Sequence, residues 1–334
     1  MNWNLLGHEW AVDLLRTHVG RGEVRHAYLI SGPQGVGRRT LALRLAQAIN
    51  CEQPPAPGDP CLACRSCRQI AAMQHPDLSI IQTPPDKTQI LVEQVRELQH
   101  SLALHPYAAR YRVALLLRFE EAGIATQNAL LKTLEEPPPQ VVLLLTAENP
   151  ELLLPTISSR CELLRLRPAP LDGLSGGLQT AYGVEAAQAT LLAHIAGGRP
   201  GIALQMLNDP QALEQRQALL DEHLHLVYSG RAERFAFADY ITKESKNRER
   251  GALRDLLLAW QSLWRDVLLC SAGAGAQPAN LDRQEQIIAL AARVDLASAR
   301  RALSCIEQTL LLLKGNVNAR LAMEVLMLNL PFLA

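Results

Sequence analysis

The chain has 334 residues, of which 48% are hydrophobic and only 4% aromatic, and its 33 basic residues equal its 33 acidic ones. This length predicts two or three domains, and the aliphatic composition favours helices over sheets. Because the formal net charge is +0, no overall field attracts nucleic acid or an anionic membrane. Contact with DNA must then come from a local patch or be shared with partner subunits.

The start of the chain and its apolar runs bear on location. Residues 1–15 contain no basic stretch followed by an apolar core, so they do not resemble a signal peptide. The longest apolar runs, Val113–Leu117 and Val141–Leu145, have the length of buried strands and are too short to span a membrane. We therefore expect a cytoplasmic protein without a membrane partner, whose seven cysteines are reduced thiols or metal ligands rather than disulfides.

Residues 1–168 alternate strand and helix patterns. The segment Arg39–Asn50 has helical periodicity and follows a strand pattern and a glycine-rich loop. Four short apolar segments are typical of strands: Ala27–Ser31, Leu78–Gln82, Val113–Leu117 and Val141–Leu145. A strand, a glycine loop, a helix and further strands of the parallel type predict an α/β nucleotide-binding sheet.

The strand patterns end after residue 168. Residues 169–208 predict short helices around a turn at Gly197–Gly201, and residues 209–334 predict a succession of helices interrupted by a linker at Ser271–Ala279. We therefore expect three domains: an α/β sheet domain (1–168), a small helical domain (169–208) and a larger all-α domain (209–334).

Four of the cysteines lie within the proline-rich segment 51–67. Cys51, Cys61, Cys64 and Cys67 have the spacing C-x9-C-x2-C-x2-C, and four thiolates so placed can close a tetrahedral Zn²⁺ site. Since no position is open for water, the zinc is expected to be structural. The alternatives are an iron–sulfur cluster and four unligated thiols. A stand-alone zinc-dependent DNA-binding module would need a cationic surface, which the neutral composition does not supply.

The glycine loop resembles a phosphate-binding loop with two residues replaced. Gly32, Gly35 and Gly37 keep the frame of the pattern G-x-x-x-x-G-K-[ST], in which backbone N–H groups wrap a phosphate. Arg38 stands at the lysine position and keeps a positive charge, while Arg39 replaces the hydroxyl that would ligate Mg²⁺. The spacing of the glycines excludes a dinucleotide-binding fingerprint.

Two further positions of an ATP site bear on hydrolysis. After the strand Val113–Leu117 the first carboxylates are Glu120 and Glu121, two to three residues late to hold a metal ion. Thr146 follows the next strand and could contact a γ-phosphate. We expect no hydrolysis at this site, although the loop is compatible with ATP or ADP binding. The alternative is an ATPase that uses Glu120 or Glu121 with Arg38.

The segment Asn128–Pro138 (NALLKTLEEPP) resembles the clamp-loader subunits of bacterial DNA polymerase III, a family within the AAA+ superfamily. The segment Arg25–Pro33, the cysteine segment 51–67 and the triplet Ser159–Cys161 are similar to the same family. The resemblance is strong over residues 1 to about 210 and weaker in the C-terminal part. It implies a RecA-like AAA+ domain with a zinc module, a helical lid, and a collar domain that holds the subunits of a hetero-pentamer together.

The family contains ATP-hydrolysing tau/gamma subunits and a non-hydrolysing delta-prime class. A motor subunit should carry Lys-Thr or Lys-Ser after the loop, Asp-Glu after the second strand and an arginine in the lid sensor. This chain instead has Arg38-Arg39, Leu117-Arg118 and Gly201. The three changes favour the non-hydrolysing class. The resemblance then implies tau/gamma and delta subunits as partners, with primed DNA and the sliding clamp reached through the assembled complex.

The resemblance also gives Arg160 a role. In this family the arginine of the Ser-Arg-Cys triplet projects into the ATP site of the neighbouring subunit, and such a trans-acting finger contributes roughly 10³–10⁵ in rate. The alternative is that Arg160 caps a helix or pairs with a local acid such as Glu162. Lys132, Glu135 and Glu136 lie on a polar helix end and are expected to form a solvated or subunit-facing surface.

Overall fold

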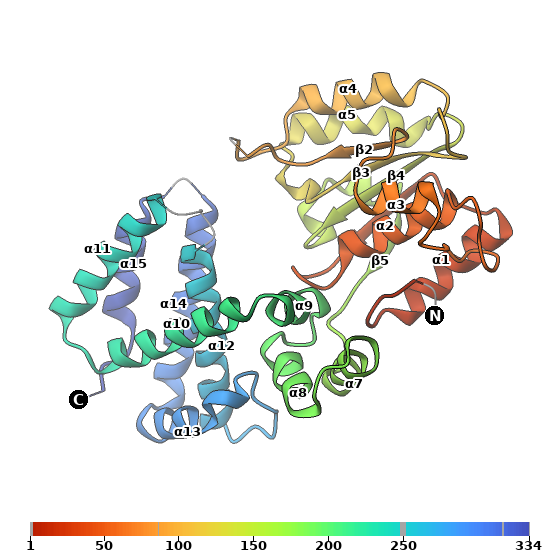
Figure 1. Ribbon diagram of the computed structural model, residues 1–334. Coiled ribbons are helices and arrows are strands. Elements are labelled where there is room, and N and C mark those ends of the chain that lie inside the picture. Colours follow the sequence, from red (N-terminus) through yellow and green to blue (C-terminus); the bar gives the residue numbers. More distant parts are fainter. Residues whose placement is uncertain (1–2, 86, 248–251, 316, 334) are drawn as a thin grey trace. The chain divides into compact units, whose positions relative to one another are not determined.

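A computed structural model describes the backbone of residues 3–85, 87–247, 252–315 and 317–333 (Figure 1). The chain divides into two compact units, Met1–Gly177 with Gly198–Ile202, and Leu178–Gly197 with Ala203–Ala334. The predicted division into three domains, with boundaries at 168 and 208, stays a prediction. Within the described ranges, no helix is both long enough and apolar enough to cross a membrane.

Five parallel strands form one sheet in the first unit, in the order β2-β3-β4-β1-β5 (Figure 1). The strands are β1 Ala27–Ser31, β2 Leu78–Ile81, β3 Arg112–Leu116, β4 Val141–Ala147 and β5 Glu162–Arg165. All residues of β1 and β4 are buried, as expected for apolar strands covered on both faces. The predicted α/β class is confirmed. Strand β5 was missed because only two apolar residues lie between Glu162 and Arg165.

Two hydrophobic cores form on opposite faces of this sheet. Along β1, Tyr28 and Ile30 belong to one core and Ala27 and Leu29 to the other, because successive side chains of a strand point to opposite faces. One face is covered by α1 Glu9–Arg21, α2 Arg38–Ile49 and α3 Arg65–Ala71. The other is covered by α4 Val92–Leu102, α5 Ile124–Glu135 and the short α6 Pro155–Ser158.

The described residues after β5 are mostly helical, as predicted. The helices are α7 Leu171–Tyr182, α8 Ala186–Ile195, α9 Pro200–Asn208, α10 Pro210–Tyr228, α11 Arg231–Asn247, α12 Ala252–Ser271, α13 Gln284–Arg293, α14 Leu296–Lys314 and α15 Ala319–Asn329. In the core of the second unit, Trp264 Nε1 donates a 2.7 Å hydrogen bond to His223 Nε2. The same imidazole lies 4.1 Å from the Trp260 ring, centroid to centroid.

Arg234 ties together the ends of two helices in this unit. All five of its N–H groups donate to backbone carbonyls, namely those of Leu226, Val227, Met327, Leu330 and Pro331. Leu226 and Val227 lie at the C-terminal end of α10 and Met327 at that of α15, while Leu330 and Pro331 directly follow α15. Carbonyls at a helix end need donors from outside the regular helix pattern. One buried guanidinium therefore satisfies both helix ends.

Candidate functional site

The glycine loop connects the end of β1 to the start of α2 and keeps a conformation that needs glycine. Gly32, Gly35 and Gly37 have φ angles of 148°, 80° and 108°, a region that residues with a Cβ rarely adopt. A Cβ on Gly32 would lie 2.4 Å from the carbonyl oxygen of Leu166. The backbone conformation therefore favours glycine at all three positions of the predicted frame, and packing also excludes a Cβ at Gly32 and Gly35.

Gly201 lies directly against this loop. Its backbone N–H donates a 2.8 Å hydrogen bond to the Gly35 carbonyl, and a Cβ on Gly201 would stand 2.8 Å from the same oxygen. The Ile202 side chain is also close, since a Cβ on Gly35 would lie 2.5 Å from its Cγ1. At position 201 the chain offers the loop a backbone contact in place of an arginine side chain.

Arg38, the first residue of α2, pairs with an acid inside the protein. Its side chain is only 9% exposed, and its Nη1 lies 3.9 Å from Glu120 Oε1. Burial lowers the pKa of Arg38 and raises the pKa of Glu120. Arg38 Nη1 and Glu120 Oε2 are buried without a hydrogen-bond partner. The charge that a lysine would present to a phosphate is thus partly balanced by an internal carboxylate.

The two candidate metal-binding carboxylates face different surroundings. Glu120 Oε1 accepts a 3.1 Å hydrogen bond from the backbone N–H of Glu148, just beyond β4. Glu121 instead accepts a hydrogen bond from the Thr83 hydroxyl, in the segment that follows β2. The structure therefore brings Glu120, but not Glu121, to Arg38.

Arg39 and Thr146 take up contacts of their own. Arg39 is exposed, and its Nη2 lies 2.9 Å from the Met73 sulfur. Thr146 is buried, and its hydroxyl oxygen accepts a 2.9 Å hydrogen bond from the backbone N–H of Arg118. The Arg39 side chain has no hydroxyl to offer a Mg²⁺ ion, and the hydroxyl of Thr146 is bound to the backbone after β3.

The four cysteines predicted to bind zinc meet in space. Their Sγ atoms all lie within 4.8 Å of one another, and sulfurs around one Zn²⁺ at about 2.3 Å would be separated by about 3.8 Å. Backbone N–H groups of Cys61, Cys64 and Cys67 donate to the sulfurs of Cys51, Cys61 and Cys64, at 3.2, 3.2 and 3.4 Å. Burial raises the pKa of Cys61, but backbone hydrogen bonds outweigh it and lower this pKa to about 7. The cluster is consistent with structural zinc.

Side chains of the first unit hold the cysteine segment in place. Asp59 accepts hydrogen bonds from Trp3 Nε1 at 3.2 Å and from Arg16 Nη2 at 2.6 Å. Gln47 of α2 donates a 2.6 Å hydrogen bond to the Cys67 carbonyl. The thiols are thus held by the helices that cover one face of the sheet.

Arg160 lies just beyond α6 at the protein surface. Its Nη2 is 2.8 Å from Glu135 Oε1, and the two side chains are 36% and 51% exposed. Its Nη1 donates a 2.9 Å hydrogen bond to the Thr156 carbonyl. Arg160 therefore does pair with an acid of its own chain, but the acid is Glu135 at the end of α5 rather than Glu162.

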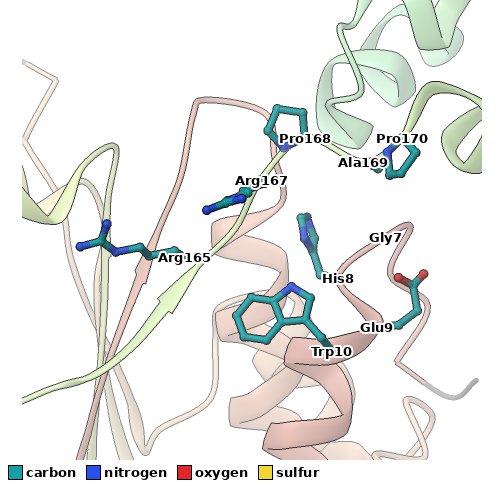
Figure 2. Close-up of a pocket in the computed structure, with 9 residues that line it drawn as sticks. All are labelled: Gly7, His8, Glu9, Trp10, Arg165, Arg167, Pro168, Ala169 and Pro170. Atoms are coloured by element: carbon teal, nitrogen blue, oxygen red, sulfur yellow. The ribbon is translucent and has the colours of Figure 1, made fainter.

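A groove of about 450 Å³ lies where the start of α1 meets the segment after β5 (Figure 2). Its lining is formed by Gly7, His8, Glu9, Trp10, Arg165, Arg167, Pro168, Ala169 and Pro170. His8 Nε2 donates a 2.8 Å hydrogen bond to the Val36 carbonyl of the glycine loop, and the Trp10 side chain is half-exposed. This groove was not predicted from the sequence, because its two halves are far apart in the chain and neither contains a motif.

Comparison with known proteins shows which proteins the chain resembles. A family model described as DNA polymerase III, delta subunit, matches residues 7–170. The DNA polymerase III subunit delta' of Pseudomonas aeruginosa is 36% identical over 217 residues, 64% of this chain and 64% of that protein. The subunit delta' of Bacillus subtilis is 27% identical over 323 residues, 96% of this chain and 94% of its own. The chain is thus similar to the delta-prime subunits of the DNA polymerase III clamp loader.

A relative named as a tau subunit matches a shorter region. The DNA polymerase III subunit tau of Escherichia coli is 34% identical over 176 residues, which are 53% of this chain and 27% of tau. The matches thus span just over a quarter of tau and slightly less than two thirds of the Pseudomonas protein. The resemblance to clamp-loader subunits drawn from the sequence motifs is confirmed, and it is of the delta-prime type.

Proposed function

We propose that this clamp-loader subunit does not hydrolyse ATP itself and instead lends Arg160 to the ATP site of a neighbouring tau/gamma-type subunit. The observation that carries the proposal is a contrast between two arginines. Arg38 is buried against Glu120 in the chain's own site. Arg160 is exposed at the surface, and some N–H groups of its guanidinium are available to another molecule.

The residues of the chain's own site support the absence of turnover. Phosphoryl transfer depends on a bound metal ion and on cations that neutralise the developing negative charge. Arg39 replaces a Mg²⁺ ligand and contacts Met73. The sensor segment contributes Gly201, whose backbone contacts the loop. The nucleotide-binding role of Gly32, Gly35, Gly37, Arg38, Arg39 and Thr146 is accordingly proposed to be degenerate.

The names of the relatives support a proposed assembly. Relatives of this chain are named as delta' and tau subunits of DNA polymerase III. We propose that tau/gamma and delta subunits surround this chain in a cytoplasmic hetero-pentamer that loads the sliding clamp onto primed DNA. In this arrangement residues 169–208 form a lid and residues 209–334 form the collar.

The test is ATP hydrolysis by the reconstituted complex with clamp and primed DNA. Arg160→Ala should lower turnover at the adjacent site by at least about tenfold, since an arginine finger contributes roughly 10³–10⁵. Arg21→Ala, at the exposed end of α1, is the matched control. Unchanged turnover in Arg160→Ala would rule out the finger.

A second candidate is a working ATPase, which the location of Glu120 beside Arg38 favours. It predicts that the isolated chain binds labelled ATP, hydrolyses it with Mg²⁺ and loses this activity in Glu120→Gln. Absence of turnover by the isolated chain excludes it, whether or not nucleotide binds.

We also propose that Cys51, Cys61, Cys64 and Cys67 hold one structural Zn²⁺. Their mutual distances and the N–H groups aimed at the sulfurs support this assignment. Metal analysis of the purified chain should find about one zinc, in line with a four-thiolate site. Cys64→Ser should lose it, and Cys270→Ser, an exposed thiol outside the cluster, should retain it.

A further inference from the structure

The contact between Arg160 and Glu135 links the proposed finger to a second helix. We propose that Glu135 is a positioning residue that holds the Arg160 guanidinium in the orientation in which it meets a neighbour's phosphates. This inference rests on the proposed function, since it assigns a role to Glu135 only if Arg160 acts in trans.

The backbone beneath Arg160 is firmly attached to α5. Gln127, near the start of α5 and buried, accepts a 2.9 Å hydrogen bond from the Leu154 N–H that precedes α6. Ile157 of α6 is fully buried in the core under that face of the sheet. Glu135, at the other end of α5, then binds the guanidinium at 2.8 Å. Helix α5 therefore holds both the backbone that leads to Arg160 and the guanidinium at the tip of its side chain.

The remaining donors of the guanidinium are available to a partner. Arginine has five N–H groups, of which one on Nη2 faces Glu135 and one on Nη1 binds the Thr156 carbonyl. Among the described residues, the Nε–H of Arg160 and the second N–H on each Nη have no hydrogen-bond acceptor. A phosphate can therefore be bound by this fork without breaking the contact to Glu135.

Physical considerations fix the size of the effect. A long arginine side chain loses rotamer freedom when it binds, and a contact that already holds its fork reduces this loss. Exposed ion pairs are weak, so the effect must be much smaller than the loss of Arg160 itself. The cation also lies at the C-terminal end of α5, where the helix dipole is negative.

The neighbouring acid provides a matched control. Glu136 follows Glu135, is also exposed, and in the described part of the chain makes no ion pair with Arg160. Glu135→Ala should lower the kcat for ATP of the reconstituted complex about two- to fivefold, the range of an exposed ion pair, with KM unchanged. Glu135→Gln keeps an acceptor oxygen and should stay within about twofold of the wild type. Glu136→Ala should have no effect.

The outcomes separate this inference from the proposed function. If Arg160→Ala lowers turnover and Glu135→Ala matches Glu136→Ala, the positioning role is wrong and the finger stands. Higher turnover in Glu135→Ala would also overturn it, since it would mean that Glu135 restrains the finger. If Arg160→Ala has no effect, both fall together. Equal thermal unfolding of the two alanine variants excludes a general loss of structure.

Discussion

Two arginine–glutamate pairs in the first unit have opposite characters. Arg38 and Glu120 are separated by 3.9 Å and are 9% and 12% exposed, whereas Arg160 and Glu135 are separated by 2.8 Å and are 36% and 51% exposed. The buried pair cannot reach a second protein without rearrangement. The exposed pair leaves three N–H groups of its arginine to a partner. Burial, more than residue type, thus distinguishes an arginine of the fold from one available to a neighbour.

The largest effect on stability is expected from breaking the buried pair. Arg38→Met should destabilise the chain by about 3 kcal/mol, because removing one partner leaves an uncompensated charge. The double variant Arg38→Met with Glu120→Leu should recover most of this loss, since no buried charge remains. Urea unfolding measures both, with the exposed Arg39→Met as control. If the double variant is no more stable than Arg38→Met, the uncompensated charge of Glu120 is not the cause of the destabilisation.

His223 tests the effect of burial on a group in the second unit. Burial lowers its pKa to about 3, and the charge of Arg234 adds to this, whereas an unfolded histidine titrates near 6.5. The neutral form is therefore favoured in the folded state, so stability is complete above pH 6.5 and falls as the pH drops toward 3. At pH 5 the loss should be about 2 kcal/mol relative to pH 7. A variant His223→Gln should remove this part of the pH dependence of unfolding.

The smallest effect is expected from the exposed pair and should depend on salt. A double-mutant cycle with Arg160→Ala and Glu135→Ala should give a coupling below about 1 kcal/mol at low salt. It should fall close to zero at about 1 M salt, where the Debye length is about 3 Å. The Arg38–Glu120 coupling should change less, because buried pairs are screened less. Equal salt dependence of the two cycles would contradict the contrast between them.

Sequence reasoning succeeded where local pattern determines structure. Strand β1 was predicted with its observed bounds because four apolar residues and Ser31 precede a glycine loop, and α2 was predicted within one residue at each end. The cysteine cluster was recognised because its ligands are close in sequence and separated by turn-forming residues. These features depend on short-range spacing, which the sequence displays directly.

Contacts between residues that are distant in sequence could not be predicted in this way. The alternative to the finger role named Glu162 as an example of an acid that could pair with Arg160. The acid that meets it comes from α5 instead, because helix packing brings Glu135 to the end of α6. Likewise, Glu120 was considered as a metal ligand, and only the fold shows it beside Arg38. Two side chains with several plausible partners cannot be paired until the backbone path between them is known.

The five carbonyls gathered around Arg234 make that position intolerant of exchange. Lysine carries three N–H donors and glutamine two, so neither can replace all five hydrogen bonds that Arg234 donates. Two of the acceptors belong to Leu330 and Pro331, so residues beyond the last helix take part in the hydrogen bonds of Arg234. Shortening the chain after Asn329 would therefore loosen α10, a helix more than a hundred residues earlier, as well as α15.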